Sequence, residues 1–164
     1  EGYYETEEGE PAVRTQGKDL TLVTVGPVLY SGLKVVEEMK AKYGMEVELI
    51  DLRFVNPLNY DKIVASVKKT GRLVMASDAV ERGSMLHTIA SNITTLCFDQ
   101  LDAPPVVVGA RNWISPAAEM EKEYYPQAEW IIDAVHERIV PLAGHTVKHN
   151  YTNGELQRIT RLGV

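Results

Sequence analysis

The chain has 164 residues, of which 45% are hydrophobic, so it is long enough for one domain with a sizeable core. Its 23 acidic and 17 basic residues give a formal net charge of −6. An acidic domain repels phosphate backbones, and no stripe of Lys and Arg interleaved with aromatic residues is evident, so nucleic acid is not an expected partner. No apolar run is long enough to cross a bilayer, so no membrane partner is expected either.

The single cysteine, Cys97, excludes an internal disulfide framework and argues against a metal site built on cysteine. It fits a reducing compartment, and we expect a cytoplasmic protein. The opening stretch EGYYETEEGE holds five glutamates and no aliphatic residue, which is typical of a linker. We therefore predict a linker over 1–10, a domain over 11–141 and a tail extension over 142–164. A chain that opens in this way is expected to belong to a longer protein.

Strand patterns recur along the body of the chain. A short edge strand is possible at 11–16, and buried or alternating apolar runs predict strands at 19–26, 45–52, 72–77 and 104–109. The double proline at Pro104 and Pro105 suits the start of the last of these strands, because proline cannot donate a backbone hydrogen bond.

Helix patterns lie between these strands. The first begins at Pro27, stops at Gly44 and has an apolar face of Leu29, Leu33, Val36 and Met39. The second is capped by Asn59. The third is capped by Ser84 and keeps unbroken three-four apolar spacing to Cys97. A short helix after Pro116 and a long one containing Ile131 to Ile139 follow. Alternating strands and helices predict a parallel sheet covered on both faces, with ligands expected beyond the strand carboxyl ends.

The loops at those carboxyl ends carry little recognisable chemistry. The loop after the first buried strand, GPVLYSG, lacks both the second glycine of a dinucleotide fingerprint and a P-loop lysine. The loop SDAVERGSM brings Asp78 and Ser84 close to His87, which invites a Ser-His-Asp interpretation. However, this serine stands at a helix start and not on a nucleophile elbow, so the cap interpretation is preferred.

Two histidines, His145 and His149, are four residues apart near the end of the chain. One helical turn would bring both to a metal ion. Glycines disfavour a long helix there, and no third ligand is evident, so exposed tail histidines are the preferred interpretation. From composition and spacing alone, the chain is an α/β/α domain that is expected to belong to a larger enzyme.

Three stretches carry a family resemblance: GKDLTLVTVGPVLYSGLKVVEEM, VELIDLRFVNPLNYDKIVASVKKTGRLVMASD and FDQLDAPPVVVGA. They resemble the C-terminal, transketolase-like domain of the beta subunit of thiamine-diphosphate-dependent 2-oxoacid dehydrogenases, the pyruvate, branched-chain and acetoin enzymes. The resemblance spans about residues 11 to 141. It implies a three-layer α/β/α fold with a five-stranded, mostly parallel sheet, in which AVRT supplies one antiparallel edge strand.

The resemblance also implies where the chemistry lies. In this family thiamine diphosphate and Mg²⁺ sit between a pyrimidine-binding and a diphosphate-binding domain, and neither domain is found in these 164 residues. The fragment is therefore expected to bind no cofactor and to be inactive alone. The intact enzyme would decarboxylate a 2-oxoacid oxidatively and transfer the acyl group to a lipoyl arm. Alternatives are a transketolase or deoxyxylulose-phosphate-synthase-like protein, or a stand-alone protein-binding domain.

The resemblance assigns partners and two site residues. Expected partners are a second beta subunit, an alpha subunit or N-terminal domains, and the lipoyl acyltransferase. In the related dehydrogenases the acid of the LDAP motif helps to hold the small basic subunit-binding domain of the acyltransferase. The matching residue here is Asp102, and Asp99 would add to the negative potential. The bland interpretation is that Asp102 only satisfies loop backbone donors. Departures from the family occur at Asp78, where Glu is common, at Ser84 and at Arg111.

Overall fold

A computed structural model describes residues 2–3 and 5–148 of the chain. Five strands form one sheet in the order β1-β3-β2-β4-β5. Only the pairing of β1 with β3 is antiparallel, whereas β2 runs parallel to β3 and β4, and β4 runs parallel to β5. This confirms the predicted five-stranded, mostly parallel sheet with one antiparallel edge strand. The strands are β1 (Ala12–Thr15), β2 (Leu20–Val25), β3 (Val47–Asp51), β4 (Leu73–Val80) and β5 (Val106–Ala110).

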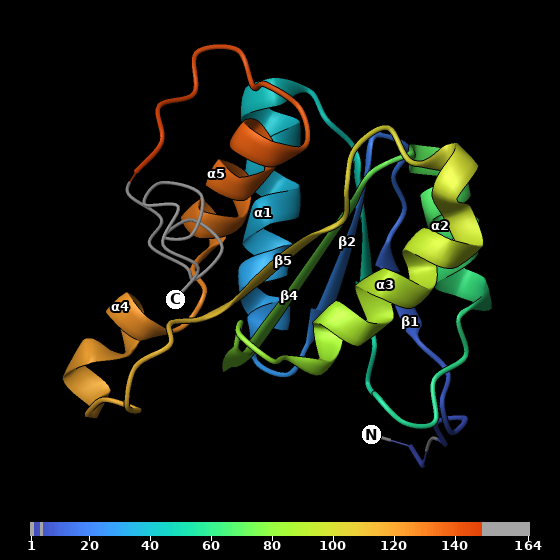
Figure 1. Ribbon diagram of the computed structural model, residues 1–164, viewed down its shortest axis with the longest axis horizontal. Helices are drawn as coiled ribbons and strands as arrows, with labels where there is room; N and C mark the ends of the chain where they lie inside the picture. Colours follow the sequence, from blue (N-terminus) through green and yellow to red (C-terminus); the bar gives the residue numbers. More distant parts are fainter. Residues whose placement is uncertain (1, 4, 149–164) are drawn as a thin grey trace.

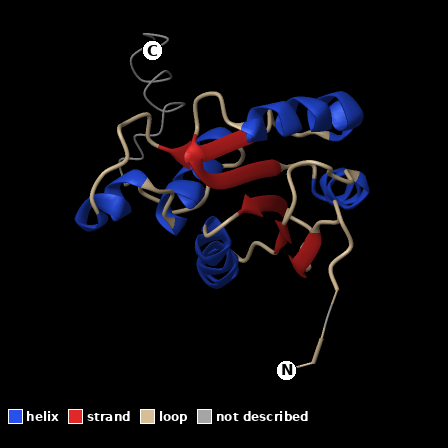
Figure 2. Ribbon diagram, turned by 90° about the horizontal axis from the view of Figure 1, so that it is seen from below, coloured by secondary structure: helices blue, strands red, loops and turns tan. Residues whose placement is uncertain are grey.

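Helices cover both faces of this sheet, as Figures 1 and 2 show. On one face α1 and α5 pack against the strands, and on the other α2 and α3 do so. The helical elements are α1 (Val28–Tyr43), α2 (Asp61–Thr70), α3 (Met85–Cys97), η1 (Phe98–Gln100), η2 (Ala118–Met120), α4 (Glu121–Tyr124) and α5 (Ala128–Arg138). The expected three-layer α/β/α arrangement is therefore present.

Each face has its own apolar core because side chains alternate along the strands. Val74 and Ala76 of β4 point to the α1–α5 side, whereas Leu73 and Met75 point to the α2–α3 side. All four residues are fully buried. A helix over each face is the arrangement that buries such two-sided strands.

The buried face of α1 matches the predicted one except at Leu33, because Met39 is fully buried and Leu29 and Val36 pack against the core. Leu33 is 38% exposed, whereas Val28, Gly32, Val35 and Met39 face the sheet. The reason lies at Gly32, where an added Cβ would come within 3.0 Å of the side chains of Leu49 and Thr24. The helix approaches the sheet along its glycine, so counting large apolar residues adds Leu33 to the buried face and misses Gly32.

Contacts are present in both segments that flank the predicted domain. Near the front, Asn59 N donates to Gly9 O at 2.8 Å, and Glu10 pairs with Lys62 at 2.9 Å. Near the other end, Leu142 is buried and residues up to Lys148 contact α5. The domain boundaries themselves stay a prediction. No helix in the described ranges is long and apolar enough to span a membrane.

Candidate functional site

Asp102 lies in the loop between α3 and β5, at the amino edge of the parallel strands. Its backbone N donates to Gly71 O at 2.7 Å, so the loop is tied to the end of α2. Gly71 has a left-handed φ of 69°, and a Cβ there would lie 2.7 Å from Asp102 Oδ2. The carboxylate therefore rests against the bare backbone of a glycine. This hydrogen bond fixes the start of the loop, and Pro104 and Pro105 stiffen its end before β5.

The Asp102 carboxylate is only lightly engaged within the chain. Its side chain is 64% exposed, and Arg72 Nε lies 3.6 Å from Oδ2. Arg72 also donates from Nη1 to Asp19 O at 3.3 Å. An exposed ion pair of this length contributes at most about 1 kcal/mol, so Asp102 keeps capacity for a further cationic partner. Asp99 is exposed in η1, and no ion pair joins it to another residue of the described part of the chain.

The opposite, carboxyl edge of the sheet holds a small pocket of about 370 Å³. Its charged lining residues are Asp78 and Glu121, and Asp78 Oδ1 would lie 3.2 Å from a Cβ at Gly26. A phosphate cradle needs backbone donors and positive charge at this position. Two carboxylates oppose a diphosphate there, so these residues do not fit the diphosphate of a thiamine cofactor.

The candidate Ser-His-Asp group is not assembled. Ser84 Oγ accepts a hydrogen bond from Leu86 N at 3.2 Å, which is the predicted helix cap. His87 is exposed on the outer side of α3, and only its backbone contacts Ser84. The cap interpretation is therefore confirmed.

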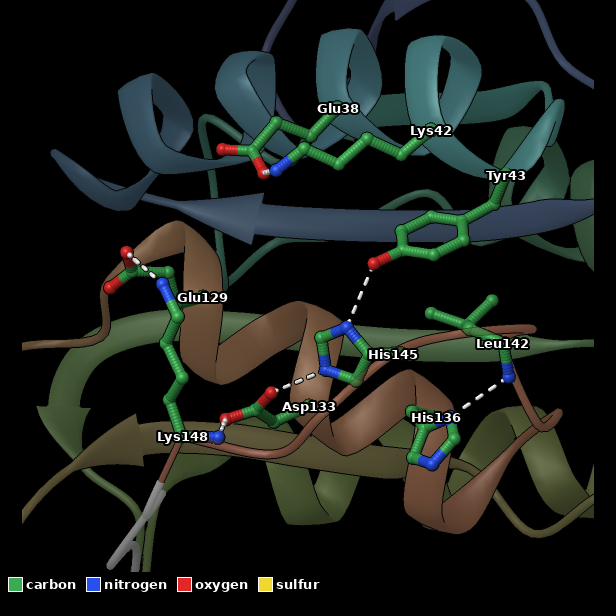
Figure 3. Close-up of polar contacts among 9 residues, drawn as sticks. All are labelled: Glu38, Lys42, Tyr43, Glu129, Asp133, His136, Leu142, His145 and Lys148. Carbon is green, nitrogen blue, oxygen red and sulfur yellow. Dashed lines mark hydrogen bonds and ion pairs between the residues drawn. The ribbon is translucent and has the colours of Figure 1, made fainter.

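His145 is not the exposed tail residue that the sequence suggested. Its Nε2 lies 2.6 Å from Asp133 Oδ1, and its Nδ1 lies 2.8 Å from the hydroxyl of Tyr43 (Figure 3). The Asp133 side chain is 1% exposed, and its other oxygen accepts a hydrogen bond from Lys148 N at 3.0 Å. A neutral imidazole satisfies both neighbours when Nε2 donates to Asp133 and Tyr43 donates to Nδ1.

These contacts form a regular ladder, which we call the C-terminal strap (residues 141–148). Leu142 N donates to His136 Nδ1 at 2.8 Å, His145 pairs with Asp133, and Lys148 Nζ lies 3.4 Å from Glu129 Oε1. The strap thus runs back along α5 from its end toward its start (Figures 1 and 3). Three-residue steps of the strap match three- and four-residue steps of the helix, which is the spacing of neighbours on one helix face.

The histidine metal site is not supported within the described ranges. No group of three or more His, Cys, Asp or Glu residues could hold an ion there. Both ring nitrogens of His145 already have partners, and His149 lies outside the described residues.

Sequence reasoning missed the packing of Arg111. This side chain is 5% exposed, and its guanidinium lies 4.6 Å from the ring centroid of Trp130 and 5.0 Å from that of Trp113. Arg111 Nε also donates to Glu123 O at 2.5 Å. An Arg between two Trp residues 17 positions apart gives no local pattern, so only the tertiary structure identifies this stack.

Comparisons with known proteins match the same part of the chain. The family model "Transketolase, C-terminal domain" matches residues 9–131. The pyruvate dehydrogenase E1 component subunit beta of Rhizobium meliloti is 36% identical over 128 residues, which is 77% of this chain and 28% of that protein. The Bacillus subtilis protein of the same name is 31% identical over 130 residues, 79% of this chain and 40% of that protein.

A solved structure described as "Split gene transketolase, inactive beta4 tetramer" superimposes with a TM-score of 0.67 at 25% identity. The match covers 82% of this chain and 42% of that one. The chain thus spans well under half the length of these relatives. The match of the family model ends at residue 131, before the C-terminal strap begins at residue 141.

Proposed function

The chain belongs to the transketolase C-terminal domain family, and we propose that it is the C-terminal domain of the decarboxylating component of a 2-oxoacid dehydrogenase complex. The curated relatives named above, pyruvate dehydrogenase beta subunits at 31% and 36% identity, support this assignment. The intact component would oxidatively decarboxylate a 2-oxoacid and pass the acyl group to a lipoyl arm. We propose that it is cytoplasmic, because a free thiol such as Cys97 is compatible with a reducing compartment.

In the intact enzyme, thiamine diphosphate with Mg²⁺ would stabilise the carbanion that decarboxylation leaves. Asp78 and Glu121 make the carboxyl-edge pocket of this domain unsuitable for that diphosphate, so other domains would hold it. We expect calorimetric titration of this chain with Mg²⁺ and thiamine diphosphate to give no binding heat, with the intact component as the positive control. A dissociation constant in the micromolar range would refute this division of labour.

The domain's own role would be assembly: contact with a second beta subunit, with the alpha subunit or N-terminal domains, and with the lipoyl acyltransferase. We propose Asp102, aided by Asp99, as the acids that hold the small basic domain of the acyltransferase. The observation that carries this proposal is an exposed carboxylate on a rigid backbone, with one long ion pair among the residues that the structure describes. A rigid group loses little freedom on binding.

The test is the affinity of the intact component for the basic subunit-binding domain of its acyltransferase at low and high salt. Asp102→Asn should weaken binding about tenfold at low salt and flatten the salt dependence, because a rim charge acts mainly on encounter. Glu37→Gln, an exposed acid on α1, is the matched control and should change neither quantity. Unchanged affinity in Asp102→Asn would return this acid to an ordinary loop role.

Contact with a second copy is a separate part of the proposal. The exposed side of α3 carries Met85 and Leu96, which are 50% and 53% exposed. We expect weak self-association of this chain, because other domains would supply the rest of the interface. Sedimentation that shows a strict monomer at high concentration would contradict this expectation.

A transketolase is the second candidate, because a transketolase structure superimposes on 82% of the chain. A deoxyxylulose-phosphate-synthase-like protein would share that fold. Neither requires an acyltransferase, and a stand-alone protein-binding domain would lack the rest of the enzyme. Salt-dependent binding of the acyltransferase domain separates the dehydrogenase from all three.

A further inference from the structure

The helix α3 has an unusual composition for a surface helix. None of its 13 residues, Met85–Cys97, is Asp, Glu, Lys or Arg. Its inner side is buried in the α2–α3 core, and its other side is exposed. Thr94 and Thr95 use their hydroxyl groups within the helix, donating to Ala90 O and Ser91 O at 2.8 and 3.1 Å. The surface that these two threonines expose is therefore largely apolar.

A groove of about 620 Å³ runs between the second half of α3 and the loop that holds Asp102. Its walls are Ala90, Ser91 and Thr94 on one side and residues 101–105 on the other, with Phe98 at one end. Phe98 is 74% exposed. A rigid wall of Pro104 and Pro105 and small residues on the helix form a preformed slot for an apolar side chain.

Charge beside the groove indicates what kind of partner fits it. Asp102 lines the groove with a mostly exposed carboxylate, and Asp99 directly follows Phe98. Within residues 5–148, the cation paired with this loop is Arg72, whose Nε lies 3.6 Å from Asp102 Oδ2. An occupant must therefore bring an apolar side chain for the slot and a basic side chain for the acids. An acidic partner would be repelled by the two carboxylates. A uniformly polar partner would leave water in the groove.

We propose that this groove is an anchor site for an apolar side chain of the docking partner, and that Phe98 is its principal contact. The proposal rests on the acyltransferase docking described above, because it names the same partner and adds the apolar half of its recognition. Phe98 and the groove give the affinity that does not depend on salt, whereas Asp102 steers the basic group. Buried aromatic contacts dominate binding energies, and charges at the rim govern encounter.

The experiment titrates the intact component with the subunit-binding domain of its acyltransferase at several salt concentrations. Phe98→Ala should weaken binding about tenfold at every salt concentration, so the slope against salt stays that of the wild type. Phe98→Met, which keeps an apolar contact, should recover most of that loss. Tyr30→Ala is the matched control, because Tyr30 is an aromatic residue of α1 that is 72% exposed on the other face of the sheet. Thermal unfolding of each variant checks that the fold is retained.

The outcomes separate the two proposals. Full affinity in Phe98→Ala with a loss in Asp102→Asn refutes the anchor and leaves the docking acid standing. Absence of binding by the wild-type component refutes docking and the anchor with it. A loss of self-association in Phe98→Ala, seen by sedimentation while the acyltransferase domain still binds normally, assigns the groove to a second copy and overturns the proposal. Equal losses in Phe98→Ala and Tyr30→Ala also count against a specific anchor.

Discussion

Asp133 and Asp102 are two aspartates of one domain with opposite surroundings. Asp133 is 1% exposed and accepts from His145 and from Lys148 N, so its two oxygens are occupied within the fold. Asp102 is 64% exposed and has one ion pair at 3.6 Å. A buried carboxylate needs hydrogen-bond partners within the fold, because its desolvation is costly. An exposed carboxylate on a fixed backbone stays hydrated and can bind a partner from another molecule. The first acid therefore contributes to stability, whereas the second is the one proposed above for recognition.

The largest expected effect is on stability at the buried acid. Asp133→Asn should lower the free energy of unfolding by about 2 kcal/mol, because the amide has one acceptor oxygen where the buried carboxylate accepts from both His145 and Lys148 N. Urea denaturation measures this. Glu129→Gln is the control, since its exposed pair with Lys148 should contribute less than about 0.5 kcal/mol. Equal losses in the two variants would erase the distinction between the buried and the exposed acid.

A smaller effect is expected on recognition at the exposed acid. Arg72→Gln removes the cation that pairs with Asp102 in the described part of the chain, so the acyltransferase domain should bind about two- to fivefold more tightly at low salt. The gain should vanish in the double variant Arg72→Gln, Asp102→Asn, because the two residues act on the same contact. A gain that survives in the double variant would mean that Arg72 acts elsewhere.

The thiol of Cys97 probes the inner side of α3, behind the proposed anchor groove. Burial raises its pKa, and the charge of Lys68 opposes this only in part. A raised thiol pKa disfavours the thiolate in the folded state, so this group costs stability as the pH rises above its unfolded value of about 8.5. We expect slow labelling by thiol reagents at pH 8. In Cys97→Ala, the loss of stability between pH 8 and 10 should be smaller than in the wild type. Rapid labelling would show that α3 opens.

The smallest effect is expected at Glu10, a half-buried acid that pairs with Lys62. Hydrogen bonds from Lys62 and Asn59 hold the pKa of this carboxyl below its usual range. Its stabilising contribution is therefore present above the unfolded pKa and is lost as the pH falls through the folded one. Melting temperatures of the wild type and Glu10→Gln should differ slightly at pH 7 and converge at low pH. A constant difference across pH would contradict this linkage.

The sequence predicts the sheet and the order of its elements because those signals are local. Alternation along the strands, Ser84 at the start of α3 and Gly44 after α1 each act over a few residues. The sequence wrongly places Leu33 on the inner face of α1, because the close approach at Gly32 depends on the sheet beneath it.

Contacts between distant residues account for what the sequence does not predict. Tyr43 and His145 are 102 positions apart and are hydrogen-bonded, and no local sequence pattern predicts this contact. Asp102 enters through family resemblance, and its exposure is visible only in three dimensions. For the groove a signal does exist, namely the lack of charge throughout α3. This lack of charge does not by itself predict a groove, because the apolar periodicity already accounts for the helix.

Gly71 affects how Asp102 should be compared between related proteins. The backbone of this glycine supports the carboxylate of Asp102, and any side chain at position 71 would collide with it at 2.7 Å. The position of the carboxylate therefore depends on the glycine, although a strand and a helix separate the two residues in the chain. A related protein that keeps the acid but replaces the glycine would carry the same charge in a different place. Asp102 should thus be compared among relatives together with the residue at position 71. Gly71→Ala would displace the charge without removing it.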